Sequence, residues 1–188
     1  MMLLAGRLRY LMWLVRAPRL RGGHSFQVGS HSAIKVSSQG RLKRRNGLIF
    51  RRGLTLVLDG PMTCGSNVFF NCYAYVSVKQ ALVIGDGVRF GERVSIHDAD
   101  HRFEPLPLDV SEVEAYDCSA ISIGNRVWVG ANSIILRGAS IGDDAVIAAG
   151  SVVRGKIPSG VLVAGAPARV IRPLAREEIA SDISCNVD

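Results

Sequence analysis

Residues 123–153 read IGNRVWVGANSIILRGASIGDDAVIAAGSVV, and an aliphatic β-branched residue returns at every sixth position. The repeated positions are Ile123, Val129, Ile135, Ile141, Ile147 and Val153. A six-residue period fits neither an amphipathic helix nor an alternating hairpin. It fits a parallel β-helix, in which each hexad forms one side of a triangular prism and its aliphatic residue points into the core. The stretch therefore predicts an all-β fold of stacked coils.

The same period extends toward the N-terminus. It passes through Ile84, Phe90 and Ile96, and, after a phase shift of two residues, through Leu58, Cys64, Phe70 and Val76. Weaker echoes occur at Val28 and Ile34. Hexads are missing from about 102 to 118, which predicts a loop that leaves the prism. At about eighteen residues per coil, the strong region gives about five coils and one continuous core.

Three blocks resemble a known family, the hexapeptide-repeat acyltransferases. They are NVFFNC at 67–72, IHDADHRF at 96–103, and the segment that begins with IGNRVWVG at 123 and ends with GAPARVIR at 172. The resemblance covers about 64–172 and is strongest to sugar and surface-polysaccharide O-acetyltransferases. It implies a left-handed parallel β-helix. The handedness comes from the resemblance alone, because parallel strands are ordinarily joined by right-handed crossovers.

His97 and His101 lie where a hexad ends and the loop begins. In the family, a histidine at this junction takes the proton of an acceptor hydroxyl as it attacks acetyl-coenzyme A, a role that suits a side chain titrating near neutral pH. The tetrad Asp-Ala-Asp-His at 98–101 resembles the Asp-His-Asn-His or Thr-Ala-Thr-His segment of sugar acetyltransferases, and its last residue is the matching histidine. The resemblance therefore implies that His101 is the catalytic base. For His97 we expect a structural or solvated role.

A zinc site is an alternative use of the two histidines, because the gamma-class carbonic anhydrases build one from three histidines on neighbouring coils. A catalytic zinc site needs three protein ligands, and the remaining histidines, His24 and His31, precede the regular coils. Asp98 and Asp100 could replace the third histidine. The cysteines lack ligand spacing, and we expect Cys64 and Cys72 in or near the core. We therefore expect no metal requirement.

Acetyl-coenzyme A is long and polyanionic, so its site needs backbone amides for the pantetheine arm and cations for the phosphates. The resemblance implies that Ala131 and Ala149 lie against the pantetheine. Arg154 and Gly155 replace a Thr-Lys pair that is common in relatives, and the resemblance implies that they also contact the cofactor. Arg169 and Arg172 match arginines that approach the phosphate end of coenzyme A.

The acceptor side of the site is also implied by the resemblance. Asn71 matches an asparagine that helps hold the acceptor in sugar acetyltransferases, although an asparagine at a coil corner is also an ordinary turn residue. In the family, the loop reaches over a cleft between adjacent prisms of a trimer. We therefore expect a homotrimer whose sites lie at subunit interfaces.

Charge is distributed unevenly along the chain. The net charge is +7, and residues 1–60 hold twelve Lys or Arg and one acid. Leu4, Leu8, Leu11 and Val15 share one helical face, and the segment is too short and too charged to span a bilayer. For the basic residues at 41–52, anionic lipid and a polyanionic glycan are both possible partners, and we favour lipid. For the N-terminal segment, contact with a membrane and a helix packed on the end of the prism both stay open. No nucleic-acid-binding fold signature accompanies the basic residues, so we expect no nucleic acid partner.

These observations divide the chain into a basic amphipathic segment at 1–22, a β-helix at 23–172, and a short helix and tail at 173–188. They predict an acetyl-coenzyme A-dependent O-acetyltransferase that modifies a sugar hydroxyl or lipid-linked glycan in surface polysaccharide biosynthesis. We expect it to be cytoplasmic, at the inner face of the membrane. An amino-sugar N-acyltransferase and a non-catalytic β-helix scaffold are the alternatives.

Overall fold

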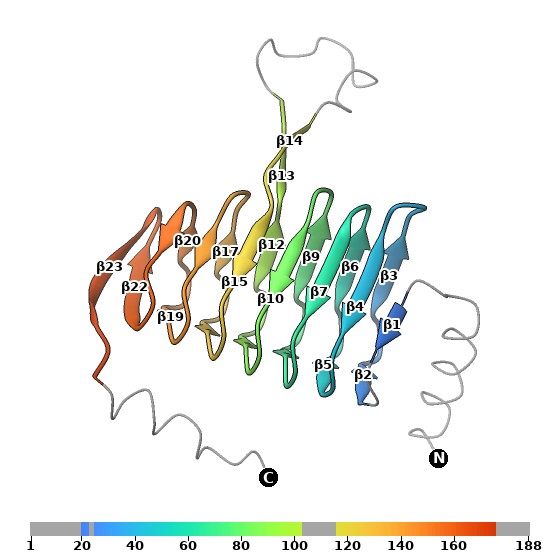
Figure 1. Ribbon diagram of the computed structural model, residues 1–188, viewed down its shortest axis with the longest axis horizontal. Helices are drawn as coiled ribbons and strands as arrows, with labels where there is room; N and C mark the ends of the chain where they lie inside the picture. The colour runs from blue at the N-terminus through green and yellow to red at the C-terminus, as the bar shows by residue number, and fades with distance from the viewer. Residues whose placement is uncertain (1–19, 23–24, 103–115, 176–188) are drawn as a thin grey trace.

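The computed structural model describes residues 20–22, 25–102 and 116–175, and in these ranges the chain is all β. Three parallel sheets form the sides of a prism, and successive strands pass from sheet A to sheet B to sheet C and back to A (Figure 1). This confirms the predicted β-helix of stacked coils, with about six turns, and it is consistent with the left-handed form. The expected N-terminal amphipathic segment, most of the loop and the C-terminal helix lie outside the described residues.

The strands are short because each contributes one side of a coil. Sheet A contains β1 (Leu20–Gly22), β4 (Arg41–Arg44), β7 (Pro61–Cys64), β10 (Leu82–Ile84), β15 (Ile121–Ile123), β18 (Ser140–Ile141) and β21 (Lys156–Ile157). Sheet B contains β2 (Phe26–Val28), β5 (Leu48–Phe50), β8 (Phe69–Phe70), β11 (Arg89–Phe90), β16 (Trp128–Val129), β19 (Val146–Ile147), β22 (Val161–Gly165) and the antiparallel β23 (Ala168–Pro173). Sheet C contains β3 (Ala33–Val36), β6 (Thr55–Leu58), β9 (Tyr75–Val78), β12 (Ser95–His97), β17 (Ile134–Ile135) and β20 (Val152–Val153). A separate hairpin consists of β13 (Ala99–His101) and β14 (Tyr116–Cys118).

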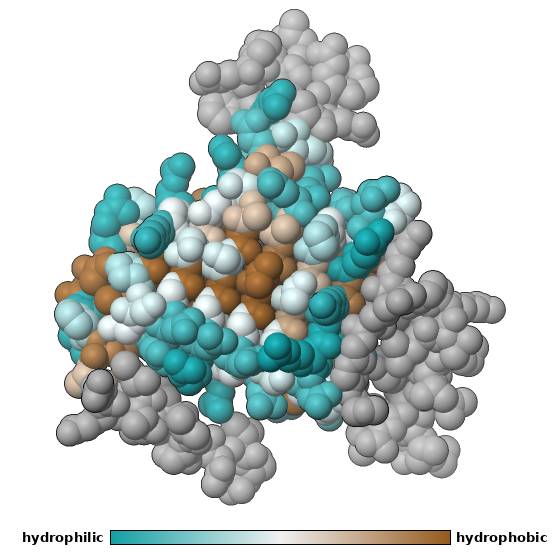
Figure 2. Space-filling view, viewed as in Figure 1, coloured by the Kyte–Doolittle hydropathy of each residue, from teal (hydrophilic) through white to brown (hydrophobic). Residues whose placement is uncertain are grey.

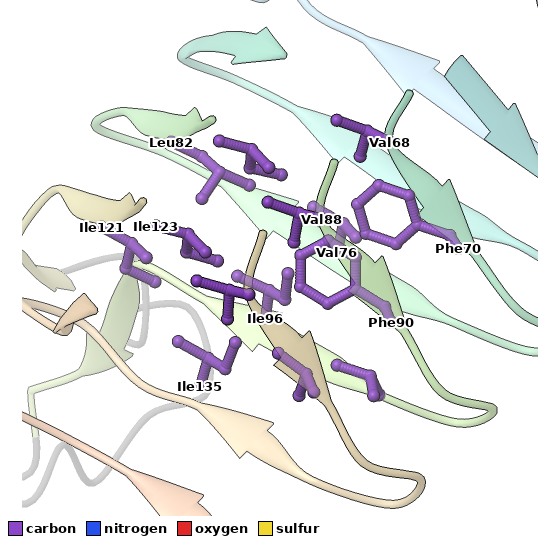
Figure 3. Close-up of a cluster of buried hydrophobic side chains, with 14 of the residues drawn as sticks. Val68, Phe70, Val76, Leu82, Val88, Phe90, Ile96, Ile121, Ile123 and Ile135 are labelled. Carbon is purple, nitrogen blue, oxygen red and sulfur yellow. The ribbon is translucent and has the colours of Figure 1, made fainter. Parts of the chain in front are cut away.

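The hexad residues form columns inside the prism, as predicted (Figure 3). Ile84 pairs with Ile123 in sheet A, although the loop separates them in the sequence, so the coil resumes in register after the insertion. In sheet B the column continues from Val28 through aromatic rings, and the Phe70 and Phe90 rings stack with centroids 4.2 Å apart. Each buried aromatic ring removes a large apolar area from water, so these columns supply much of the driving force for folding.

The first two coils, from β1 to β6, have the same three-sided form as the later ones, although the six-residue pattern is weak there. Arg44 occupies the sheet A position that Cys64 and Ile84 fill in the next two coils. Its side chain is buried, and its guanidinium lies 4.5 Å from the centroid of the Phe26 ring. A cation thus occupies an aliphatic column by stacking on an aromatic face.

Candidate functional site

A two-stranded arm leaves the prism at the corner where sheet C meets sheet A, called the C/A corner below (Figure 1). It consists of β13 and β14, which pair antiparallel so that His101 lies opposite Tyr116. It departs after β12 and returns before β15, at the predicted interruption of the repeat. The arm therefore carries His101 outside the wall of the prism.

Asp98 fixes the arm at its base. Its side chain is only 1% exposed, and the carboxylate accepts hydrogen bonds from the amide nitrogens of Lys79, Gln80 and Ala81 at 2.7, 2.7 and 2.8 Å. Its backbone carbonyl accepts a hydrogen bond from the amide nitrogen of Ser119 at 2.9 Å. Asp98 therefore joins the preceding coil to the points where the arm leaves and returns.

Side chains of both neighbouring coils brace the arm from outside. Arg137, on the following coil, donates from Nε to Asp100 Oδ2 at 2.6 Å. Lys79, on the preceding coil, places its Nζ 3.8 Å from the centroid of the Tyr116 ring. Each contact is partly exposed and individually weak, but the two hold opposite strands of the same hairpin.

His101 is exposed and its ring lies against Tyr116, with centroids 4.3 Å apart and planes inclined by 40°. An aromatic neighbour restricts the orientation of the imidazole while leaving its edge open to solvent. The arrangement presents a titratable group on a braced support. Such a group can accept a proton from a bound hydroxyl.

His97 has a different environment. It lies on sheet C, half-buried, and its ring stacks on Tyr75 with centroids 5.2 Å apart and planes 24° apart. Burial lowers the pKa of His97 below its ordinary value, and the nearby Asp100 and Asp98 oppose this shift. A half-buried ring stacked on Tyr75, whose charged form burial disfavours, fits the expected structural role.

The two carboxylates that could have supplied a third zinc ligand, Asp98 and Asp100, already have other partners. Asp98 is engaged by three backbone amides, and Asp100 by Arg137. In the described part of the chain, no group of three His, Cys, Asp or Glu side chains is placed to hold a metal ion. Cys64 is buried as expected, and its pKa rises to about 12 because burial disfavours the thiolate. Cys72 is half-buried.

Asn71 lies at the corner where sheet B meets sheet C, called the B/C corner below. Its Oδ1 accepts a hydrogen bond from the amide of Cys72 at 2.9 Å, the local contact of a turn residue. Asn71 thus lies at one end of the sheet C strands, and the arm with His101 leaves from the other end. Within one chain, the two residues do not share a corner.

Ala131 and Ala149 stack on successive coils at the B/C corner, where the backbones approach closely. A Cβ atom added to Gly91 would lie 2.6 Å from the amide nitrogen of Ala131, and one added to Gly130 would lie 2.5 Å from that of Ala149. Among the described residues, neither alanine amide donates to an acceptor. This edge of the prism therefore offers backbone donors with only methyl groups beside them.

The predicted basic residues lie near the C-terminal end of the prism. Arg154 and Gly155 are exposed at the C/A corner of the last full coil. Arg169 and Arg172 are exposed on β23. Arg169 pairs with Ala164 of β22, and the next residue, Gly165, aligns with Ala149 at the B/C corner. The structure thus aligns Ala131, Ala149 and Arg169 along one edge, and it places Arg154 and Gly155 on another.

Three features of the site were missed at the sequence level. Two of them are the hydrogen bonds that Asp98 accepts from the preceding coil and the bond that Arg137 donates to Asp100. Both join residues on different coils, so no local motif marks them. The third is Trp128, which points outward from sheet B and is 48% exposed. Alternation within β16 could have shown this, because Val129 is the hexad residue and its neighbour must face solvent.

Comparison with known proteins gives three findings. The family model described as bacterial transferase hexapeptide (six repeats) matches residues 120–155. The putative lipopolysaccharide biosynthesis O-acetyl transferase WbbJ of Escherichia coli K12 is 33% identical over 138 residues, which cover 68% of this chain and 70% of WbbJ. The galactoside O-acetyltransferase of the same organism is 34% identical over 110 residues, and the chain spans about half of it (53%).

A solved structure adds a cofactor-bound relative. The hexapeptide-repeat acetyltransferase VCA0836 of Vibrio cholerae, in complex with acetyl-coenzyme A, superimposes with a TM-score of 0.56. The sequences are 27% identical, and the match covers 79% of this chain and 71% of the other. Within the described ranges, no helix is long and apolar enough to cross a membrane.

Proposed function

Because this chain belongs to the hexapeptide-repeat acyltransferases, we propose that it transfers an acetyl group from acetyl-coenzyme A to a sugar hydroxyl, with His101 as the general base. The observation that carries this proposal is the placement of His101 on an arm that Asp98 anchors and Arg137 braces. The names of the relatives support the reaction class, and WbbJ supports a role in surface polysaccharide biosynthesis.

The chemistry is direct transfer. His101 accepts the proton of the acceptor hydroxyl while the hydroxyl oxygen attacks the thioester carbonyl carbon. A backbone amide of a coil stabilises the oxyanion, the carbon–sulfur bond breaks, and coenzyme A leaves as its thiol after taking a proton. The products are an acetyl ester and coenzyme A. Contact with Tyr116 keeps the imidazole oriented without enclosing it.

The cofactor would lie along the B/C corner toward β23. Ala131 and Ala149 supply amide donors next to small side chains, which suits the pantetheine arm. Arg169, with Arg172 on the same strand, supplies charge for the phosphates. Arg154 and Gly155 lie at the other end of the sheet C strands, so they would contact this cofactor from a neighbouring subunit or contribute only to the local field.

A complete site would then combine two copies of the chain. Asn71 and His101 lie at opposite ends of the sheet C strands, so an acceptor held by Asn71 would meet the His101 arm of a neighbour. The homotrimer expected from the family resemblance provides this arrangement. The proposal includes an arm that walls the acceptor pocket between two prisms.

The direct test measures thiol release from acetyl-coenzyme A by the full-length protein with a panel of free and lipid-linked sugars. His101→Ala should abolish acceptor-dependent release, because general base catalysis contributes about 10²- to 10⁴-fold. His97→Gln, four residues away on the wall of the prism, is the matched control and should retain activity. If the two variants lose activity equally, His101 is not the base; if the wild type binds no coenzyme A, the non-catalytic scaffold is the better interpretation.

The shared site has its own test. Asn71→Ala and His101→Ala subunits should each be inactive, but in the proposed trimer a mixture would contain interfaces where both residues are intact. The two variants are mixed in equal amounts, unfolded, and refolded together. In random assembly about a quarter of the interfaces then combine an intact Asn71 with an intact His101, so about a quarter of the wild-type activity should return. If the mixture stays inactive, both residues act within one subunit or Asn71 has no role in the acceptor site.

A further inference from the structure

One end of the prism is purely basic. The described residues from Leu20 to Leu58 include eight Lys or Arg and no Asp or Glu, whereas the other described residues hold ten basic and eight acidic side chains. This first segment forms the outermost two coils, from β1 to β6. Among the described residues, most of the excess positive charge therefore lies at one end of the prism.

Six of these cations have exposed side chains, and we call them the cationic collar. The collar consists of Lys35, Arg41, Lys43, Arg45, Arg51 and Arg52. Among the ion pairs of the described residues, the one that includes a collar residue is Arg45 with Asp86, at 3.6 Å between two exposed groups. The collar is thus a concentrated field of positive charge with little internal compensation.

The collar surrounds the end of the prism instead of following one side. Arg41 and Lys43 lie on sheet A, Lys35 lies on sheet C, and Arg51 and Arg52 lie at the B/C corner. Figure 2 shows hydrophilic side chains at this end of one face and apolar side chains nearer its middle. Lys35 lies on the outermost coil, and the other five collar residues lie on the second coil, about 4.8 Å farther in. This depth is within the Debye length of about 8–10 Å over which an anionic surface attracts cations.

Aromatic rings support part of the collar. The Arg51 guanidinium lies 5.6 Å from the centroid of the Phe69 ring, and that of Arg52 lies 5.6 Å from the Tyr73 ring. Stacking of this kind orders the long side chains while leaving their polar edges free for an anion. Both rings belong to the third coil, so the stacks keep these two charges on the outside of the prism, where they act on a surface through their field.

We propose that the cationic collar docks the prism, end-on, against an anionic lipid bilayer. A flat surface can meet cations from all three sides of the prism at once, whereas a nucleic acid duplex or a linear glycan would need them along a single face. The sequence that precedes the collar, residues 1–19, adds four arginines interleaved with apolar residues such as Leu4, Leu8 and Leu11, the composition of an interfacial segment. The proposal stands independently of the acetyltransferase reaction.

The test is co-sedimentation of the full-length protein with vesicles of phosphatidylcholine alone or mixed with phosphatidylglycerol. Binding should require the anionic lipid and should weaken with added salt. Each basic residue near such a surface contributes about fivefold to the partition coefficient, so Arg51→Glu with Arg52→Glu should weaken binding at least about 25-fold. The same loss is expected for Arg41→Glu with Lys43→Glu, because end-on contact uses more than one side.

The matched control reverses two exposed charges elsewhere, with Arg89→Glu and Lys156→Glu, and should bind vesicles like the wild type. Substitution of Arg51 and Arg52 by Gln, which removes charge without reversal, should give an intermediate loss, and a urea unfolding midpoint close to that of the wild type would exclude misfolding as the cause. The proposal is overturned if neutral vesicles bind equally well, if the control loses as much affinity as the collar variants, or if only one of the two collar pairs matters.

Discussion

The base of the arm gives the sharpest stability prediction, through Asp98. Its carboxylate has 1% exposure and accepts hydrogen bonds from three amides at 2.7 to 2.8 Å. In Asp98→Asn the side-chain oxygen can still accept hydrogen bonds, but the NH₂ group that replaces the second oxygen cannot. That NH₂ group would face a backbone N–H, which is also a donor. A buried donor left unpaired costs about 1–3 kcal/mol, and charge assistance is also lost, so we expect a destabilisation of about 2–4 kcal/mol.

Urea unfolding of the full-length protein measures this cost as a shift of the midpoint with little change in slope. Asp117→Asn is the control, because that carboxylate forms an exposed ion pair with Arg102 and its loss should cost less than about 1 kcal/mol. In the transferase assay, Asp98→Asn should reduce kcat through a mispositioned arm, with little change in KM for acetyl-coenzyme A. Equal midpoint shifts for the two variants would refute the anchoring role of Asp98.

Three further predictions concern the core and its titrating groups. Phe70→Ala should lower the unfolding free energy by about 3–5 kcal/mol, because it interrupts the column of stacked rings, whereas Phe69→Ala on the outer side of the same strand should cost much less; thermal or urea unfolding compares them. At pH 8 a thiol reagent should label exposed Cys118 rapidly and leave Cys64 unmodified in the folded protein, because burial raises the pKa of Cys64 to about 12; equal labelling rates would contradict this. Burial lowers the pKa of His97 in the folded protein, so as the pH falls the unfolded state binds a proton before the folded state does. The contribution of His97 to folding stability is therefore full above about pH 6.5 and declines below it. His97→Gln should flatten this part of the curve of urea midpoint against pH.

The sequence predicts the repeating architecture well because each coil uses the same local rule. A hexad position faces the core whatever precedes it, so Ile84 and Ile123 could be assigned to one column across the loop. The pattern weakens before Leu58 because Arg44 occupies a core column, and only the stack on Phe26 makes this acceptable. No six-residue rule could anticipate that exception.

The site is less predictable than the fold because it depends on contacts between coils. His101 and the alanines of the B/C corner were assigned through family resemblance, and their roles stay predictions. Asp98 and Arg137 reach partners 17 to 19 and 37 residues away, respectively, at distances that the stacking determines. Their residue types alone give no sign of these partners, because aspartate and arginine at a turn are ordinarily solvated.

The antiparallel β23 has a consequence for how the protein behaves in concentrated solution. A stack of parallel coils can in principle be extended by another molecule, because the last strand of each sheet presents unpaired amides and carbonyls. In sheet B, β23 folds back on β22 with a register shift between Leu162 and Val163, so the final edge runs against the direction of every other strand in that sheet. The strands of an incoming coil would have to pair antiparallel with β23 and parallel with the last strands of sheets A and C, which a regular parallel coil does not do. The chain reversal thus acts as a terminator, which keeps a self-complementary architecture from growing into a fibre at its C-terminal end.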